Sequence, residues 1–505
     1  MVTAEEEELS RLNIKYPLIP PSPKPGSKAF AYAHIFFSPE TNEIYYYIVE
    51  PKLDEMEKKL LSDIKDYIQE KVDVNFAQVR KIEAVGHITK IFNSALEYFN
   101  VKIDEETRQI LKYYVFRDFI GLERIEPFLK DKQIEDISCD GVNIPIYIYH
   151  RNPKLGSLKT NVQFRSREIL DSFVNKIAER CGRSISVSKP LLDGTLPDGS
   201  RVQATLGSDI ARHGSNFTMR MFTDKPLTTT DVIDFGTCDI NMMAYLWFLV
   251  ENNFSFLVCG GTATGKTSFL NVISLFIKPQ MKIVSIEDTS ELRLPHSHWV
   301  PEVARTPISE EGKVDMFELL RESLRQRPDY IIVGEVRGKE AYVLFQQMAV
   351  GHPGLSTIHS ENLPKLIDRL TSPPISLPPN LIQNLDAIIF LKRVKKGRKY
   401  IRRVNSITEV IGFDRKNNTP VTNETFRWLA KTDKFKVVNK SFLLKKIADS
   451  TDLSEKEIGR EIRKRASVIK WLVDNNIRDY KRIGMIFNLF YTNPSYLLKK
   501  IEGGI

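Results

Sequence analysis

Cysteine is scarce in this sequence, and long apolar runs are absent from it. Only four of the 505 residues are cysteine, and no two of them are close enough to form a CxxC pair. We therefore expect neither a zinc ribbon nor a disulfide framework. We expect the protein to be in a reducing compartment. No apolar run approaches the roughly 20 residues that a membrane-spanning helix needs. Four glutamates (5–8) stand where a signal peptide would carry an apolar segment. We expect a cytoplasmic protein whose membrane role, if any, is peripheral.

The overall charge is basic without being extreme. Lys and Arg number 73 and Asp and Glu number 64, which gives a net charge of +9. This balance suits an acidic membrane face, a nucleotide or a nucleic acid, and does not choose among them. Hydrophobic residues make up 42% and charged residues 27%, as in an ordinary globular protein. At roughly 150 residues per domain, the length predicts about three domains.

Local patterns divide the chain into successive regions. Dense prolines predict a flexible tail over 1–28, and polar residues around Pro226 predict a linker over 223–230. Strand-like runs at 254–259, 282–286, 330–333, 355–358 and 387–391 alternate with helical patterns, which predicts a mainly parallel sheet covered by helices. The remaining boundaries are a strand and helix region over 29–130, an α+β domain over 131–222, an α/β domain over 231–440 and a C-terminal helical segment over 441–505.

The strongest motif is a phosphate-binding loop. Residues 260–267 read GGTATGKT, which fits G-x-x-x-x-G-K-[ST] in full, and a strand is predicted before it and a helix after it. Glycines let the backbone N–H groups face phosphate, and the helix start adds a positive dipole end. In this pattern the lysine neutralises the β- and γ-phosphates and the hydroxyl after it ligates Mg²⁺. The expected nucleotide-binding residues are Gly260, Gly261, Thr262, Ala263, Thr264, Gly265, Lys266, Thr267 and Ser268, with Thr267 as the Mg²⁺ ligand. A glycine-rich turn that matches by chance is the alternative.

A carboxylate follows a second buried strand. The run 330–333 is succeeded by Gly334 and Glu335, with no aspartate in the strand. P-loop sites often hold Mg²⁺ through an aspartate at this position. Glu335 can polarise a water or hold Mg²⁺ through one. Capping of the following helix is the alternative.

Two further clusters follow strands of the same predicted sheet. IEDTSE (286–291) places three carboxylates at a strand end in the first crossover after the loop, where they would face the ligand crevice, and where N-capping is an alternative role. His352 and His359 flank a short strand and can sense the γ-phosphate through hydrogen bonds. A lone histidine is otherwise more often structural.

These four stretches, in this order, resemble the secretion ATPase superfamily of type II secretion, type IV pili and archaella. GGTATGKT, IEDTSE, IIVGE and GHPGLSTIH are similar to its Walker A, Asp box, Walker B and His box, and the Gly-Glu ending of the Walker B strand is itself typical of that family. Upstream, LPDGSR (196–201) and GSNFTMR (214–220) also resemble it, as does RQRPD (325–329). The likeness covers residues from about 110 to about 415 and looks closest to the archaeal branch.

The resemblance implies a fold and an assembly. We expect a RecA-like P-loop motor domain with a mainly parallel sheet, preceded by an α+β N-terminal domain. Such proteins form hexameric rings in which hydrolysis of Mg²⁺-bound ATP drives rigid-body domain movement. The implied partners are further copies of the chain and a polytopic membrane platform protein, which would place it peripherally at the inner face of the cell membrane.

The resemblance also implies roles for single residues. An Asp-box glutamate and the Walker B glutamate support hydrolysis, which gives Glu291 (with Glu287 as second choice) and Glu335. His359 is the phosphate-sensing histidine. Arg201 and Arg220 match arginines of the N-terminal domain that complete the site, and a structural salt bridge is the alternative for each.

The basic run 392–403 (KRVKKGRKYIRR) is expected to be a hairpin tip at Gly397. A solvated hairpin is favoured over contact with an acidic partner or anionic lipid, and DNA comes third, because only Tyr400 offers a stacking surface. The functional hypothesis is a motor for assembly of a pilus-like or archaellum-like filament, or for secretion. Its rivals are a nucleic-acid translocase of the conjugation type and an ATP-gated switch that does not hydrolyse.

Overall fold

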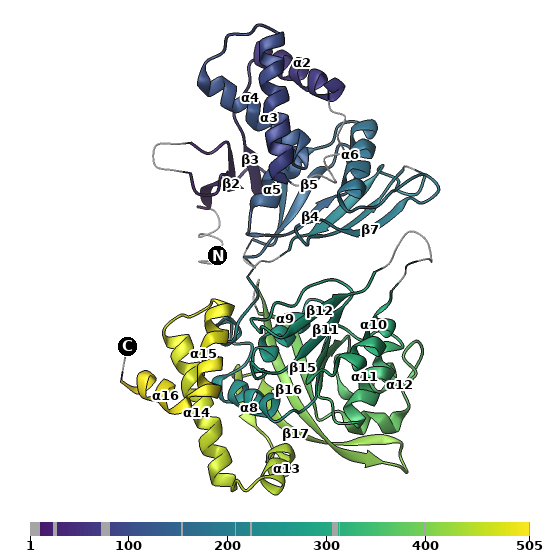
Figure 1. Cartoon of the computed structure of the whole chain (residues 1–505), viewed down its shortest axis with the longest axis vertical. Coiled ribbons are helices and arrows are strands. Elements are labelled where there is room, and N and C mark those ends of the chain that lie inside the picture. The colour runs from purple at the N-terminus through teal and green to yellow at the C-terminus, as the bar shows by residue number, and fades with distance from the viewer. Residues whose placement is uncertain are drawn as a thin grey trace. The chain divides into compact units, whose positions relative to one another are not determined.

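The computed structural model of the chain describes residues 11–23, 28–71, 81–152, 155–207, 209–222, 225–305, 312, 314–396 and 399–503. The chain divides into two compact units, Met1–Thr223 and Asp224–Ile505. Each unit has its own nine-stranded sheet and its own apolar core (Figure 1).

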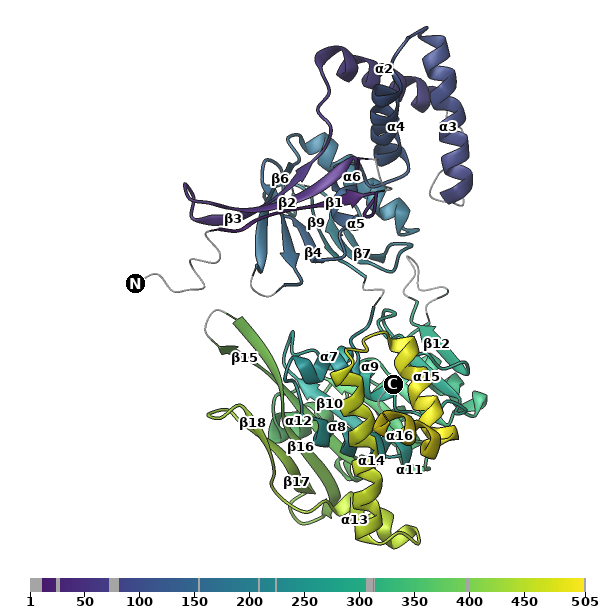
Figure 2. The same ribbon diagram turned by 90° about the vertical axis from the view of Figure 1, so that its left-hand side faces the viewer.

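The first unit is a mixed sheet with helices. Its strands are β1 (Asn13–Ile19), β2 (Ala31–Ser38), β3 (Glu43–Val49), β4 (Ile134–Cys139), β5 (Pro145–His150), β6 (Ser157–Gln163), β7 (Leu191–Thr195), β8 (Arg201–Thr205) and β9 (Asn216–Arg220), in the order β1-β2-β3-β6-β5-β4-β9-β8-β7. Its helices are α2 (Glu55–Lys71), α3 (Lys81–Tyr98), α4 (Glu105–Phe119), α5 (Glu126–Lys130) and α6 (Arg167–Arg180). Helices α2, α3 and α4 pack against one another at one end of this unit (Figure 2).

Helix α6 shows how the sequence produces one of these elements. Ser166 caps its start by accepting a hydrogen bond from the N–H of Ile169. Leu170, Phe173 and Ile177 then recur at helical spacing and are buried, and Phe173 lies against Phe217 of β9 with ring centroids 5.4 Å apart. The helix is therefore held on the sheet by one apolar stripe.

The predicted proline-rich tail is wrong for residues 13–19, which form β1. This strand pairs antiparallel with β2, and Leu18 is buried in the core of the first unit. Proline cannot donate to a strand ladder, but β1 lies at the edge of the sheet, where Pro17 is tolerated beside a register shift. Density of proline alone did not distinguish an edge strand from a free tail.

The second unit is built on a sheet whose first six strands are parallel. Its strands are β10 (Phe256–Gly260), β11 (Ile283–Glu287), β12 (Trp299–Val303), β13 (Tyr330–Val333), β14 (Gly354–Ile358), β15 (Ala387–Lys396), β16 (Lys399–Asp414), β17 (Thr419–Leu429) and β18 (Lys434–Val437). The order is β12-β11-β13-β14-β10-β15-β16-β17-β18, parallel from β12 to β15 and antiparallel from β15 to β18. All five strands predicted between 254 and 391 are present in the parallel part.

Helices cover both faces of this sheet. They are α7 (Thr229–Asp234), α8 (Ile240–Glu251), α9 (Lys266–Ser274), α10 (Met316–Ser323), α11 (Glu340–Ala349), α12 (Leu363–Thr371), α13 (Phe442–Ser450), α14 (Glu455–Asp474), α15 (Tyr480–Thr492) and α16 (Pro494–Glu502). Phe256 and Val258 of β10 belong to the core shared with α8, α9 and α14, whereas Leu257 and Cys259 belong to the core shared with α10, α11 and α12. This double burial explains why the strands read as unbroken apolar runs.

One boundary prediction changes in the second unit. Residues 228–230 were assigned to the linker because they are polar, but they are buried at the start of α7, where the Thr230 hydroxyl donates to the carbonyl of Ile477 at 2.7 Å. Internal hydrogen bonds thus make these threonines core residues. The predicted C-terminal helical segment is present and packs into the same core as α8, and a capping box of Ser454 and Glu457 begins α14.

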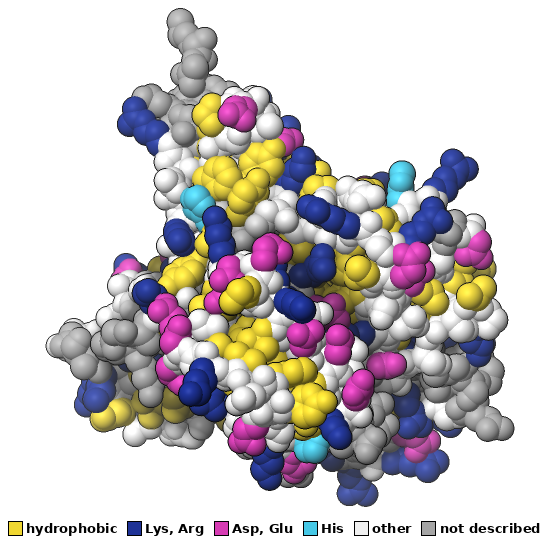
Figure 3. Space-filling view, turned by 90° about the horizontal axis from the view of Figure 1, so that it is seen from above, with side chains coloured by type: hydrophobic (Ala, Val, Ile, Leu, Met, Phe, Trp, Pro, Cys, Tyr) yellow, Lys and Arg dark blue, Asp and Glu magenta, His cyan; other side chains and the backbone are white. Residues whose placement is uncertain are grey.

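The surface carries charges of both signs, in agreement with the composition. On the face drawn in Figure 3, basic and acidic side chains are interspersed over the coloured residues, so this face does not present a field of one sign. None of the helices in the described part of the chain is both long and apolar enough to span a membrane.

Candidate nucleotide-binding site

The phosphate loop joins β10 to α9, as its motif predicts. Gly265 caps α9 with φ = 85°, and Ala263 also takes a left-handed conformation with φ = 58°. A Cβ atom on Gly260 would lie 2.5 Å from the Thr264 hydroxyl oxygen, so only glycine fits where the strand turns into the loop. Thr267 is half-buried and Ser268 exposed in the first turn of α9. The loop and the start of α9 therefore form a cradle for phosphate.

Lys266 lies inside this cradle. Its ammonium is mostly buried and donates to the carbonyl of Gly261 at 3.1 Å. It also lies 3.3 Å from the Nδ1 atom of His359. Burial lowers the pKa of the Lys266 ammonium, while the nearby Glu335 carboxylate acts in the opposite direction. The lysine predicted to bind phosphate is thus held by weak partners that a phosphate can replace.

A chain of polar contacts continues from the lysine to Glu335. The Nε2 atom of His359 lies 3.3 Å from Oε1 of Glu335, and the other carboxylate oxygen accepts a hydrogen bond from Arg337 at 2.7 Å. Arg337 also donates to Asp288 at 3.1 Å. Burial and the charge of Lys266 lower the pKa of His359, which favours the neutral ring, while the Glu335 carboxylate acts in the opposite direction. The ends of β10, β14 and β13 thereby bring the predicted Lys266, His359 and Glu335 together.

The two Asp-box glutamates differ in environment. Glu287, at the end of β11, is buried, and its Oε1 accepts the N–H groups of Glu291 and Leu292 at 3.0 Å each. Burial raises the pKa of Glu287 to about 7. A Cβ atom on Gly334 would lie 3.1 Å from Cγ of Glu287, so the glycine before Glu335 allows β13 to end close to this carboxyl. Glu287, the second choice, therefore packs against the glycine that precedes Glu335, whereas Glu291, the first choice, is exposed.

The remaining predicted residues lie elsewhere. His352 precedes β14 and lies at the opposite end of that strand from His359. Arg201 and Arg220 belong to the first unit, where they are register partners on β8 and β9. Arg220 is largely exposed and forms an ion pair with Asp136 at 3.3 Å. Of the predicted residues, the second unit thus brings together the phosphate loop, Glu335 and His359.

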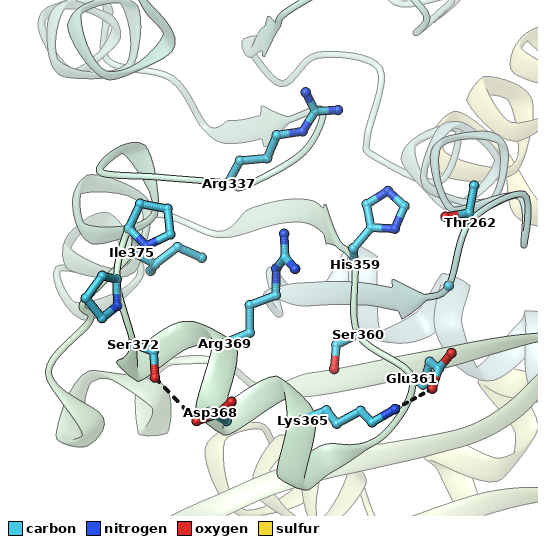
Figure 4. A pocket seen from close by; sticks show the side chains of 13 residues that line it. Thr262, Arg337, His359, Ser360, Glu361, Lys365, Asp368, Arg369, Ser372 and Ile375 are labelled. Carbon is cyan, nitrogen blue, oxygen red and sulfur yellow. Dashed lines mark hydrogen bonds and ion pairs between the residues drawn. The ribbon is translucent and has the colours of Figure 1, made fainter.

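A pocket of about 540 Å³, lined by both basic and acidic side chains, opens beside the loop. Gly261 and Thr262 form one wall, and Arg337, His359 and Arg369 line it from other segments. Figure 4 shows Arg369 reaching from α12 towards the space between Arg337 and His359. Neither arginine is predicted from the sequence. Arg337, two residues after Glu335, could have been found from its position, whereas Arg369 enters the pocket only through the tertiary fold.

The oxygen atoms present suit Mg²⁺ better than a metal held by many protein ligands. Glu335 Oε1 is buried and accepts no hydrogen bond from the described residues, although His359 Nε2 lies 3.3 Å away, and the Thr267 side chain lies in the first turn of α9. Mg²⁺ is typically bound by one or two protein oxygens together with waters and substrate phosphates. Within the described residues no group of three or more His, Cys, Asp or Glu side chains forms a separate metal site.

Comparison with known proteins now decides the family. Residues 121–424 match the family described as Type II/IV secretion system protein, which is more than half of the chain. The chain belongs to this family. Its C-terminal residues 431–504 match the family described as PilB3-like, C-terminal. The predicted membership of the secretion ATPase superfamily is confirmed.

Relatives extend over different shares of the chain. The uncharacterized protein MJ0900 of Methanocaldococcus jannaschii is 36% identical over 97% of this chain and 91% of its own length. The type IV secretion system protein PtlH of Bordetella pertussis is 30% identical over 50% of this chain and 79% of its own. A crystal structure of the VirB11 ATPase from the Brucella suis type IV secretion system is 21% identical, covering 55% of this chain and 93% of that one with a TM-score of 0.28. The RecA-like fold expected for the second unit agrees with membership of this family.

Proposed function

We propose that this protein is a Mg²⁺-dependent ATPase that acts as a homo-hexameric motor for assembly of a type IV pilus-like or archaellum-like filament, or for secretion. The observation that carries the proposal is the continuous chain from Lys266 through His359 to Glu335. Because these residues come from the ends of three neighbouring strands, their meeting beside a phosphate loop is not a feature of the motif alone.

Each residue has a task that follows from its position. Lys266 exchanges Gly261 O and His359 for the β- and γ-phosphates, and the loop N–H groups and the helix start hold the rest of the phosphate chain. Thr267 and Glu335 would hold Mg²⁺, directly or through water, and the ion would neutralise charge on the phosphates. Glu335 orients the attacking water with Oε1, since Arg337 holds its other oxygen. His359, in contact with Glu335, is positioned to report the state of the γ-phosphate.

The assembly and its partners are part of the same proposal. Arg201 and Arg220 each present a guanidinium from the first unit, and one of them supplied to an active site would stabilise charge on the transferred phosphoryl group. A hexameric ring would couple that contact to domain movement. The partner is a polytopic platform protein, which keeps the motor cytoplasmic and peripheral at the inner face of the membrane.

Steady-state ATP hydrolysis with Mg²⁺ tests the proposal, with Glu335→Gln beside the wild type. The matched control is Glu322→Gln, which changes an exposed carboxylate on α10 of the same unit. Turnover by the wild type and the control, with ATP bound but not hydrolysed by Glu335→Gln, supports the motor. If neither the wild type nor the control hydrolyses ATP, the ATP-gated switch takes its place. Stimulation by DNA, weakening steeply with salt, would instead favour the nucleic-acid translocase.

A further inference from the structure

The basic hairpin of the second unit begins beside the phosphate loop. Strand β15 pairs with β10 up to the register pair of Gly260 and Leu391, where β10 turns into the loop. Strand β15 then continues through Lys396 and pairs antiparallel with β16, as the predicted hairpin requires. Gly397, its expected tip, lies outside the described residues. Part of the basic stretch therefore projects from the nucleotide-binding edge of the sheet.

Three of the six cations of this hairpin with described side chains already have partners in the second unit. Lys396 and Arg403 form ion pairs with Asp433 at 3.0 and 2.8 Å. The guanidinium of Arg393 stacks on the ring of Tyr400, 3.8 Å from its centroid. These contacts engage three of the cations that made an acidic partner or anionic lipid an alternative in the sequence analysis.

Arg402 differs because it turns towards the phosphate loop. Its Nε atom donates to the carbonyl of Ala263 at 3.0 Å, and its Cδ atom lies 3.4 Å from where a Cβ atom on Gly265 would stand. The residue is exposed, and no ion pair among the described residues includes it. The Nε side of the guanidinium is thus fixed to the loop, and its two terminal nitrogens form no hydrogen bond or ion pair with the described residues.

The strand order indicates which part of a nucleotide this arginine meets. His359 and Glu335 follow β14 and β13, which lie on one flank of β10, and they fix the γ-phosphate end there. The nucleoside must leave the loop away from that flank, and β15 is the strand on the other flank. We propose that Arg402 binds the phosphates nearest the nucleoside in ADP and ATP while its Nε braces the loop. This inference rests on the proposed function and adds a nucleotide-binding residue to the same site.

Calorimetric titration of the full chain with ADP and Mg²⁺ tests the assignment. The variants are Arg402→Ala and Arg402→Lys, and Lys395→Ala is the control because Lys395 is an exposed cation of the same hairpin. Losing one charge-assisted contact to phosphate should raise the Kd of Arg402→Ala about tenfold. Arg402→Lys should keep most of the affinity, because an ammonium still attracts phosphate as a point charge. The control should stay within twofold of the wild type.

The salt dependence of the Kd for ADP distinguishes a contact of Arg402 with phosphate from a role in holding the loop. If Arg402 contacts phosphate, the Kd of Arg402→Ala should rise less steeply with NaCl than that of the wild type, because one ionic contact is missing. An unchanged Kd for Arg402→Ala would overturn the proposal. Equal losses of affinity for ADP in both variants, with the salt dependence of the wild type, would also overturn it, because they would show that Arg402 only holds the loop in place. Intrinsic tryptophan fluorescence verifies that each variant is folded. Failure of the wild type to bind ADP would be a different result, because it would remove the proposed ATPase itself.

Discussion

Replacing Glu287 by glutamine should stabilise the second unit at alkaline pH. The carboxyl is 2% exposed, one oxygen accepts two backbone N–H groups, and the other is buried without a hydrogen-bond partner. Burial raises the pKa of Glu287 from 4.5 to about 7, which means that the folded protein holds the proton more tightly than the unfolded chain does.

The sign and size of the effect follow from that shift. Stability from this group is fully present below pH 4.5 and is lost as the pH rises through about 7, since the ionised form is penalised only in the folded state. At about 1.4 kcal/mol per pKa unit, ionisation of Glu287 costs about 3 kcal/mol at pH 8 and about 1 kcal/mol at pH 5. Glutamine keeps the accepting oxygen and cannot ionise. Glu287→Gln should therefore gain about 3 kcal/mol over the wild type at pH 8 and much less at pH 5.

Urea unfolding followed by tryptophan fluorescence measures this unit alone. All four tryptophans, Trp247, Trp299, Trp428 and Trp471, lie in the second unit, so the first unit contributes no tryptophan signal. Nucleotide is left out, because binding would add its own stabilisation. The control is Glu322→Gln, which changes an exposed carboxylate on α10 that is not among the groups shifting the pKa of Glu287, and it should change little at either pH. An equal gain for Glu287→Gln at pH 5 and pH 8, or no gain at pH 8, would refute the reasoning.

Three further changes probe the packing, the loop and the catalytic carboxylate. Arg465→Met leaves Glu251 without its buried partner and should lower the stability of the second unit by about 3 kcal/mol, again read from tryptophan fluorescence. Gly260→Ala places a methyl group 2.5 Å from the nearest loop oxygen, so the Kd for ADP should rise at least about tenfold in calorimetry. Arg337→Ala frees one oxygen of Glu335 and should lower kcat about tenfold with KM within twofold, and a change in KM alone would contradict a positioning role.

The phosphate loop and the strands around it could be predicted because their signals are local. The loop is one contiguous motif, and the parallel strands are apolar throughout because both faces are covered. Glu335 and His359 could be proposed because each follows such a strand, and carboxyl ends of parallel strands meet at one edge of a sheet. The contact between them further depends on β13 and β14 being neighbours in the sheet, an order that the sequence pattern does not specify.

The residues that were missed depend on the tertiary fold. Arg369 has no motif around it, and Arg402 belongs to a basic run that predicts a hairpin and not a contact with the phosphate loop; they come from different elements, α12 and β16. Strand β1 and the buried Thr230 were assigned to a tail and a linker from composition, because proline and threonine are common in both settings. Their placement follows from an edge position and from internal hydrogen bonds, neither of which is visible in a single sequence.

The contacts of Lys266 also indicate which step moves the protein under the proposed function. Without phosphate the ammonium is shared between Gly261 O and His359, and His359 in turn contacts Glu335. A phosphate that captures the lysine must change the partners of His359, and this histidine stands at the end of β14, just before α12. Binding alone would thus alter the strand ends before any bond is broken. Glu335→Gln should therefore keep the conformational response to ATP while losing turnover, whereas His359→Ala should weaken the response itself.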